Sequence, residues 1–106
     1  MNKINRKSSL AKEVKRRCDN RCQICNGDRI QIREDEFYAE AHHIHPRGLG
    51  GDDKLENMIC VCPNCHVKLD YRIIPLDKSK IYFLDKHPIG DAYIAYHNET
   101  YFPEEK

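Results

Sequence analysis

The chain has 106 residues, 40% of them hydrophobic and 33% charged, with a formal net charge of +1 and no Trp. This length gives one small domain whose apolar core alone is a weak source of stability, so a further stabilising element is expected. No apolar run approaches the ~18 residues of a membrane span, and the first residues do not resemble a signal peptide. We therefore expect a soluble, intracellular protein of the cytoplasm rather than a membrane or secreted protein.

The first predicted element is a basic helix in the N-terminal segment, residues 1–16. Ser8 or Ser9 can cap this helix, which is expected to extend to about Cys18. Apolar residues spaced four apart give it one face that packs on the core, and lysines and arginines occupy most of the remainder.

Three short strands and a second helix are predicted in the central part of the chain. Residues 30–32 and 37–44 alternate apolar and polar side chains, and residues 58–61 are apolar, so all three segments favour strands. The glycines and aspartates between the last two segments predict an irregular loop that ends at Asn57. Pro63 suits the first position of a helix, which is expected to follow directly.

The C-terminal extension, residues 73–106, carries weaker signals. Two further strands are predicted there, at residues 80–84 and 93–97, separated by a Pro- and Gly-containing turn. No repeat or second domain is visible. We therefore interpret residues 1–106 as a single domain with its core in residues 17–70, and the oligomeric state stays open.

Four of the six cysteines stand in two Cys-x2-Cys pairs, Cys22 with Cys25 and Cys62 with Cys65. In a reducing compartment such grouped thiols hold a metal more often than they form disulfides, and two pairs complete a tetrahedral four-sulfur shell typical of zinc. A closed shell leaves no position for water. We therefore expect a structural zinc ion that contributes about 10 kcal/mol to folding.

The other two cysteines, Cys18 and Cys60, are expected to be small buried hydrophobic residues, although the Cys18-x3-Cys22 spacing also permits an exchange of ligands. The segment between the two cysteine pairs has 36 residues, which exceeds the loop of an ordinary zinc ribbon. Function is therefore expected within this insert.

The insert contains the run Glu40-Ala41-His42-His43-Ile44-His45-Pro46, then Gly50-Gly51, Asn57 and Cys62-Pro63-Asn64-Cys65-His66. In this order and spacing, the sequence resembles the HNH endonucleases from about Arg17 to Asp70. The resemblance implies an α+β fold of the ββα-metal (His-Me finger) type, in which a two-stranded hairpin and a helix hold one catalytic divalent ion. Here that fold is expected to be stabilised by zinc and flanked by the N-terminal helix and the C-terminal strands.

The resemblance also implies catalytic roles in the hydrolysis of a DNA phosphodiester bond. His43 is expected to be the general base, because an imidazole is largely neutral near pH 7 and can accept a proton from water. His42 and His66 are expected to bind a catalytic ion such as Mg2+ or Mn2+, which acts as a Lewis acid and template. Asp70, four residues after His66 on the same helix face, is either a third ligand or a solvated side chain. Asn57 is expected to organise the loop that orients His43.

The charge distribution supports a nucleic acid as the partner. Residues 1–33 carry a net charge of +7, whereas the remainder carries -6. A basic segment of this kind suits a phosphate backbone, although a solvated helix face is an equally simple explanation. The expected phosphate contacts, which would position DNA without reading its sequence, are Arg16, Arg17, Arg21 and Arg47.

Other polar residues near the motif have structural interpretations. Surface or packed imidazoles are expected at three positions, His45, His87 and His97. Glu40 is expected to pair with Arg17 or Arg21, either beside the site or as a plain surface ion pair. Asp52 and Asp53 are expected to shape the loop.

The sequence therefore predicts a zinc-stabilised HNH endonuclease that nicks or cleaves DNA with the help of a divalent ion. The alternative is a catalytically silent zinc module that binds nucleic acid or a partner protein through the same basic face. A nuclease that acts on RNA ranks lower, because the resemblance points to DNA enzymes. The tyrosine-rich end of the chain is expected to complete the core, to form a dimer contact or to meet DNA.

Overall fold

The computed structural model describes residues 6–105, so the first five residues of the predicted basic segment lie outside the described part. The helices are α1 (Arg6–Arg17), α2 (Pro63–Asp70) and α3 (Asp91–Tyr101). The strands are β1 (Ile30–Arg33), β2 (Glu36–Tyr38), β3 (Glu40–His43) and β4 (Met58–Val61). The predicted α+β class is confirmed, and β3, β4 and α2 form the ββα unit.

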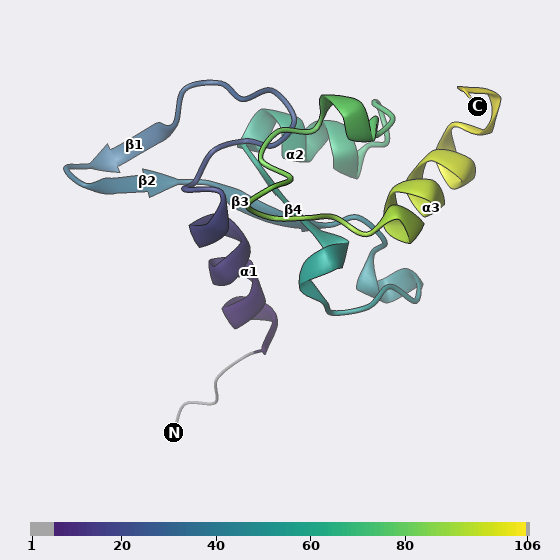
Figure 1. Ribbon diagram of the computed structural model, residues 1–106, viewed down its shortest axis with the longest axis horizontal. Coiled ribbons are helices and arrows are strands. Elements are labelled where there is room, and N and C mark those ends of the chain that lie inside the picture. The colour runs from purple at the N-terminus through teal and green to yellow at the C-terminus, as the bar shows by residue number, and fades with distance from the viewer. Residues whose placement is uncertain (1–5, 106) are drawn as a thin grey trace.

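The antiparallel hairpin of β3 and β4 lies between two helices (Figure 1). Its register pairs Glu40 with Val61 and His43 with Met58. Neighbouring side chains of a strand point to opposite faces, so each strand supplies both sides of the hairpin. One face packs against α1 and the other against α2.

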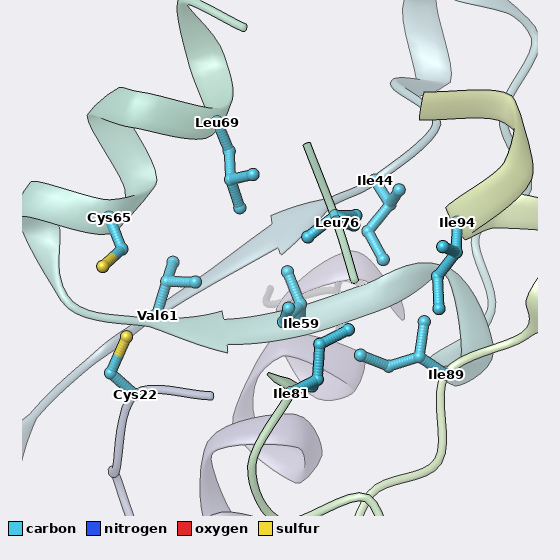
Figure 2. Close-up of a cluster of buried hydrophobic side chains, with 10 residues drawn as sticks. All are labelled: Cys22, Ile44, Ile59, Val61, Cys65, Leu69, Leu76, Ile81, Ile89 and Ile94. Atoms are coloured by element: carbon cyan, nitrogen blue, oxygen red, sulfur yellow. The ribbon is translucent and has the colours of Figure 1, made fainter. Parts of the chain in front are cut away.

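Two hydrophobic cores result from this arrangement. The larger core lies between the hairpin, α2 and the C-terminal segment, and Figure 2 shows its ten buried residues, Cys22, Ile44, Ile59, Val61, Cys65, Leu69, Leu76, Ile81, Ile89 and Ile94. The smaller core, between α1 and the other face, contains Val14, Cys18, Ala39, Met58 and Cys60. The predicted burial of both unpaired cysteines is thereby confirmed. The division of the whole chain into a core and two flanking segments stays a prediction.

The second predicted strand, residues 37–44, is divided into two. β2 pairs with β1 in a separate ribbon, whereas β3 pairs with β4, and the chain changes partner at the buried Ala39. The β1–β2 ribbon projects from the body of the molecule (Figure 1). Both Ile30 and Ile32 are largely exposed there, so their alternation predicts the strand correctly but not its burial.

The N-terminal helix begins earlier than predicted. α1 contains Ser8 and Ser9, so neither serine is its cap. Its last turn carries Lys15, Arg16 and Arg17, whose positive charges interact favourably with the helix C-terminus. None of the helices in the described part of the chain combines the length and apolar character that a bilayer span requires.

The two predicted C-terminal strands do not form. Residues 80–84 lie at the end of a short 3-10 helix and in the turns after it, and residues 93–97 lie inside α3. The apolar run at 93–97 is too short to distinguish the two-residue period of a strand from the 3.6-residue period of a helix. A helix forms because it places Ile94 and His97, three residues apart, on one buried face. Asp91 in the first turn also favours the helix.

The larger core is expected to limit the stability of the protein. Ile59 is fully buried in β4, whereas Ile32 is 46% exposed in β1. We predict that Ile59→Ala lowers the free energy of unfolding by about 2–4 kcal/mol, because the substitution removes buried methyl groups and leaves a cavity. The matched variant Ile32→Ala should lower it by less than about 1 kcal/mol. Urea unfolding followed by circular dichroism measures both, and equal losses would contradict this description of the core.

Candidate active site

Four thiols meet beside the N-terminus of α2. Cys22 and Cys25 come from the turn after α1, and Cys62 caps α2, with Cys65 in its first turn. The four Sγ atoms all lie within 4.8 Å of one another, and those of Cys25 and Cys62 are 3.9 Å apart. A tetrahedral shell with Zn–S bonds of ~2.3 Å has sulfur–sulfur edges of about 3.8 Å. The arrangement therefore fits a four-sulfur ion site.

Backbone N–H groups support negative charge on these sulfur atoms. The N–H groups of Ile24 and Cys25 each donate to Cys22 Sγ at 3.4 Å, and Cys65 N–H donates to Cys62 Sγ at 3.5 Å. Burial and the neighbouring thiolate of Cys22 raise the pKa of the Cys65 thiol. A bound cation would offset both effects, which suits a site that binds metal through thiolates.

A second group of metal-binding side chains lies at the end of β3. His42 comes from the strand, and His66 and Asp70 stand one turn apart on α2. His42 Nδ1 lies 3.4 Å from Asp70 Oδ1, and His66 Nε2 lies 3.7 Å from Asp70 Oδ2. The two imidazole rings meet edge to face, with centroids 5.1 Å apart. Two nitrogen atoms and a carboxylate form an open shell suited to a divalent cation. The fold thus brings together all three predicted ligands of the catalytic ion.

The imidazole of His42 is neutral at physiological pH. Its side chain is 9% exposed. Burial is the main cause that lowers the pKa of His42 to about 4, and the nearby imidazole of His66 lowers it further. A neutral ring keeps a lone pair available for a metal ion.

Glu40 orients His66. Its Oε1 lies 2.6 Å from His66 Nδ1, and because a carboxylate only accepts hydrogen bonds, the proton is on Nδ1 and the Nε2 lone pair is free. Tyr38 Oη donates to Glu40 Oε2 at 2.6 Å, and this bond, together with His66, holds the pKa of Glu40 below its usual range. The predicted ion pair between Glu40 and Arg17 or Arg21 is therefore wrong.

His43 turns to the loop between β3 and β4 rather than to the ligand group. Its Nε2 lies 3.1 Å from Asp53 Oδ1. The proton between them belongs to Nε2, so Nδ1 of His43 carries the basic lone pair. Sequence reasoning gave Asp53 only a loop-shaping role, because ten residues separate it from His43 and its Gly- and Asp-rich surroundings indicate nothing beyond a turn.

Asn57 fastens this loop from inside. Its side chain is fully buried, and its Oδ1 accepts from His45 N–H at 2.8 Å. Its Nδ2 donates to the carbonyl oxygens of His45 at 2.9 Å and Asp52 at 2.7 Å. A Cβ atom at Gly51 would lie 1.7 Å from the His45 carbonyl oxygen, so only glycine fits there. These contacts tie both ends of the loop together, beside Asp53.

The C-terminal helix supports the same loop from outside. Tyr93 Oη donates to Asp52 Oδ2 at 2.8 Å. The ring of His45 stacks on that of Tyr96, with centroids 3.6 Å apart and planes at 6°. Because α3 also contributes Ile94 to the larger core, the C-terminal extension completes that core and contacts the candidate active site.

Two histidines outside the ligand group fill structural roles, as predicted. His87 Nε2 lies 2.7 Å from the Met58 carbonyl oxygen, and His97 Nε2 lies 2.8 Å from that of Ile74. Both imidazoles are buried, and burial lowers the pKa of each. The third, His45, is the packed ring described above, and its Nε2 also lies 2.9 Å from the Leu49 carbonyl oxygen.

The four arginines predicted to contact phosphate lie on α1, directly after it, and in the loop. Arg16 and Arg17 both bind Glu13, at 2.7 and 2.9 Å. Arg21 is half-buried after the helix. Arg47 lies 3.8 Å from Asp53 in the loop. Their contact with DNA stays a prediction.

The hairpin, the loop and helix α2, with one candidate ligand on β3 and two on α2, form an arrangement of the ββα-metal type. Residues 22–72 match the model of the HNH endonuclease family, so the predicted resemblance is confirmed for this part of the chain.

A restriction enzyme among the relatives and a solved restriction endonuclease agree with this assignment. The Type IV methyl-directed restriction enzyme EcoKMcrA of Escherichia coli (strain K12) is 35% identical over 47% of this chain and 18% of its own length. Anaredoxin of Nostoc sp. is 33% identical over 54% of this chain and 66% of its own length. The modification dependent TagI restriction endonuclease superposes with a TM-score of 0.77 at 29% identity, over 88% of this chain and 37% of that one. The chain thus spans less than half the length of either restriction enzyme.

The depressed pKa of His42 has a consequence for stability in protein without added divalent ion. Between pH 6.5 and about 4 the unfolded chain binds a proton at His42 that the folded chain does not. We predict that the free energy of unfolding falls as the pH is lowered through this window, by at most about 3 kcal/mol from this residue. In His42→Gln the free energy of unfolding should fall less with pH, because the contribution of His42 is gone. Some decrease should remain, because burial also lowers the pKa of His87 and of His97. Urea titrations at stepped pH measure both slopes, and identical slopes would contradict the burial effect.

Proposed function

We propose that this chain is a metal-dependent HNH endonuclease that hydrolyses phosphodiester bonds of DNA. The observation that carries the proposal is the division of labour between two consecutive histidines. His42 joins His66 and Asp70 in one ligand group, while His43 is held separately by Asp53. A ligand group beside an independently oriented base is what hydrolysis of a phosphodiester requires.

His43 would act as the general base. With its Nε2–H donated to Asp53, Nδ1 accepts the proton of the attacking water. The carboxylate of Asp53 then stabilises the imidazolium that forms and keeps the ring in one orientation. Asn57 would act indirectly, because it fixes the loop that carries Asp53.

His42, His66 and Asp70 would hold the catalytic ion. When bound, an ion such as Mg2+ or Mn2+ supplies Lewis-acid stabilisation of charge on the phosphate. The residues prepare for it in three ways: burial keeps His42 neutral, Glu40 fixes the tautomer of His66, and Asp70 adds negative charge.

The four-cysteine cluster would hold a structural zinc ion. Its closed shell offers no position for substrate. The ion would join the turn after α1 to the start of α2, and so would set the position of the helix that carries His66 and Asp70.

DNA is the proposed substrate. Two proteins to which the chain is similar are named as restriction enzymes, and residues 1–33 carry a net charge of +7. Binding through phosphates should weaken as the salt concentration rises. The alternative, a silent zinc module, leaves the His42, His66 and Asp70 group without a use.

The test is a cleavage assay on supercoiled plasmid DNA with Mg2+ or Mn2+. We predict that the protein cuts only when the divalent ion is added, and that His43→Ala lowers the rate at least about 100-fold, because the water loses its base. The zinc content should be unchanged, and circular dichroism should show that the variant is folded at the assay temperature. The control Asn64→Ala, an exposed residue at the start of α2, should cut like the wild type.

Undiminished cutting by His43→Ala would remove that residue from its proposed role. If the wild type cuts neither DNA nor RNA with any divalent ion, the silent zinc module takes the place of the nuclease. Faster cleavage of RNA than of DNA would assign the activity to RNA instead.

A further inference from the structure

Arg72 ends helix α2 in an unusual backbone conformation. Its φ is 56°, in the left-handed region, and its N–H donates to the Leu69 carbonyl oxygen at 3.1 Å. The next residue, Ile73, donates to the Lys68 carbonyl oxygen at 2.8 Å and closes the helix. Glycine usually occupies this position, because a side chain there costs conformational energy. The fold therefore holds Arg72 in a backbone conformation that side-chain-bearing residues rarely adopt, and this fixes where its side chain begins.

The guanidinium of Arg72 is held by an aromatic ring of α3. Its Cζ lies 4.4 Å from the ring centroid of Tyr101. Tyr101 meets the ring of Tyr96 edge to face, with centroids 6.2 Å apart, and Tyr96 in turn stacks on His45 of the loop. A guanidinium on an aromatic face is oriented, yet its N–H groups remain free to bind an oxyanion.

Arg72 also borders the proposed catalytic ligands. A cavity of about 40 Å³ is lined by side chains of β3, the loop, α2 and α3, namely His42, Ile44, Pro46, Leu69, Asp70, Arg72, His97 and Tyr101. Two of these residues, His42 and Asp70, belong to the ligand group. A permanently charged side chain therefore lines the same cavity as two of the three candidate ligands of the ion.

We propose, on the basis of the proposed function, that Arg72 binds the nonbridging oxygens of the scissile phosphodiester and that Tyr101 is its positioning residue. The phosphate gains negative charge as water attacks, and a guanidinium held in advance stabilises that charge through two parallel hydrogen bonds. Asp70 is the acidic group nearest along the chain, and the catalytic ion would compensate its charge. The ligand is thus a phosphodiester of a nucleic acid strand.

The key variant is Arg72→Gly, because glycine suits the left-handed backbone and the protein should remain folded. With a duplex DNA substrate and Mn2+, we expect this variant to lower kcat/KM about 100-fold. Mn2+ binding without DNA, followed by electron paramagnetic resonance, should be unchanged. Arg72→Lys should recover only part of the loss, because lysine keeps the charge but not the planar fork. The control is Lys86→Ala, which removes an exposed positive charge outside the basic segment and the site, and it should stay within about twofold of the wild type.

Tyr101 is tested in the same assay. Tyr101→Phe keeps the ring under the guanidinium and should behave like the wild type, whereas Tyr101→Leu should lose part of the rate at unchanged Mn2+ affinity. Wild-type rates in Arg72→Gly, or equal losses in Arg72→Gly and Lys86→Ala, would overturn the proposal.

A binding assay separates this proposal from that of the nuclease. If the wild type binds DNA but does not cut it, the proposed function fails. The role of Arg72 is then tested by the salt dependence of DNA binding in the wild type and in the variants. A plot of the logarithm of the DNA-binding constant against the logarithm of the salt concentration has a negative slope, and the loss of one phosphate contact makes this slope shallower by about 0.9. A change of that size in Arg72→Gly but not in Lys86→Ala supports phosphate binding, and the same slope in both variants overturns it.

Discussion

The convergence of four sulfur atoms within 4.8 Å is the constraint on which the rest of the structure depends. It joins the turn after α1 to the first residues of α2, and Cys22 and Cys65 also belong to the larger core (Figure 2). Four thiolates packed this closely repel one another unless a cation lies between them. An ion bound there, as proposed, would fix the helix that faces β3, and this helix carries His66 and Asp70.

The proposed chemistry depends on the way β3 and the loop after it separate two consecutive histidines. His42 points into the ligand group beneath α2, and burial keeps it neutral. His43 is bound by Asp53, so the two rings have different partners, and the proposed mechanism gives them different roles. The loop is held from inside by Asn57 and from outside by α3 through Tyr93, which makes the C-terminal segment part of the support of the site.

The parts predicted well from the sequence are those encoded by local spacing. The Cys-x2-Cys pairs, Pro63 at the start of α2, and His66 and Asp70 one turn apart each fix geometry within a few residues. The contacts that were missed join residues far apart in the chain, as Glu40 with His66 and Arg72 with Tyr101 do. The sequence spacing of such pairs does not predict their contact, because the contact arises when α2 and α3 pack on the hairpin. The strand predicted at residues 93–97, which lie in α3, is wrong for a related reason. The periodicity of so short an apolar run does not distinguish a helix from a strand, and the packing against the core decides between them.

The most direct test of two distinct ion sites is anomalous X-ray diffraction from crystals of the protein grown with Mn2+. Data collected on either side of the zinc edge should give one zinc peak among the Sγ atoms of Cys22, Cys25, Cys62 and Cys65. A manganese peak should lie between His42 Nδ1, His66 Nε2 and the carboxylate of Asp70. Cysteines without zinc, or manganese bound anywhere else, would contradict the division into a structural and a catalytic ion.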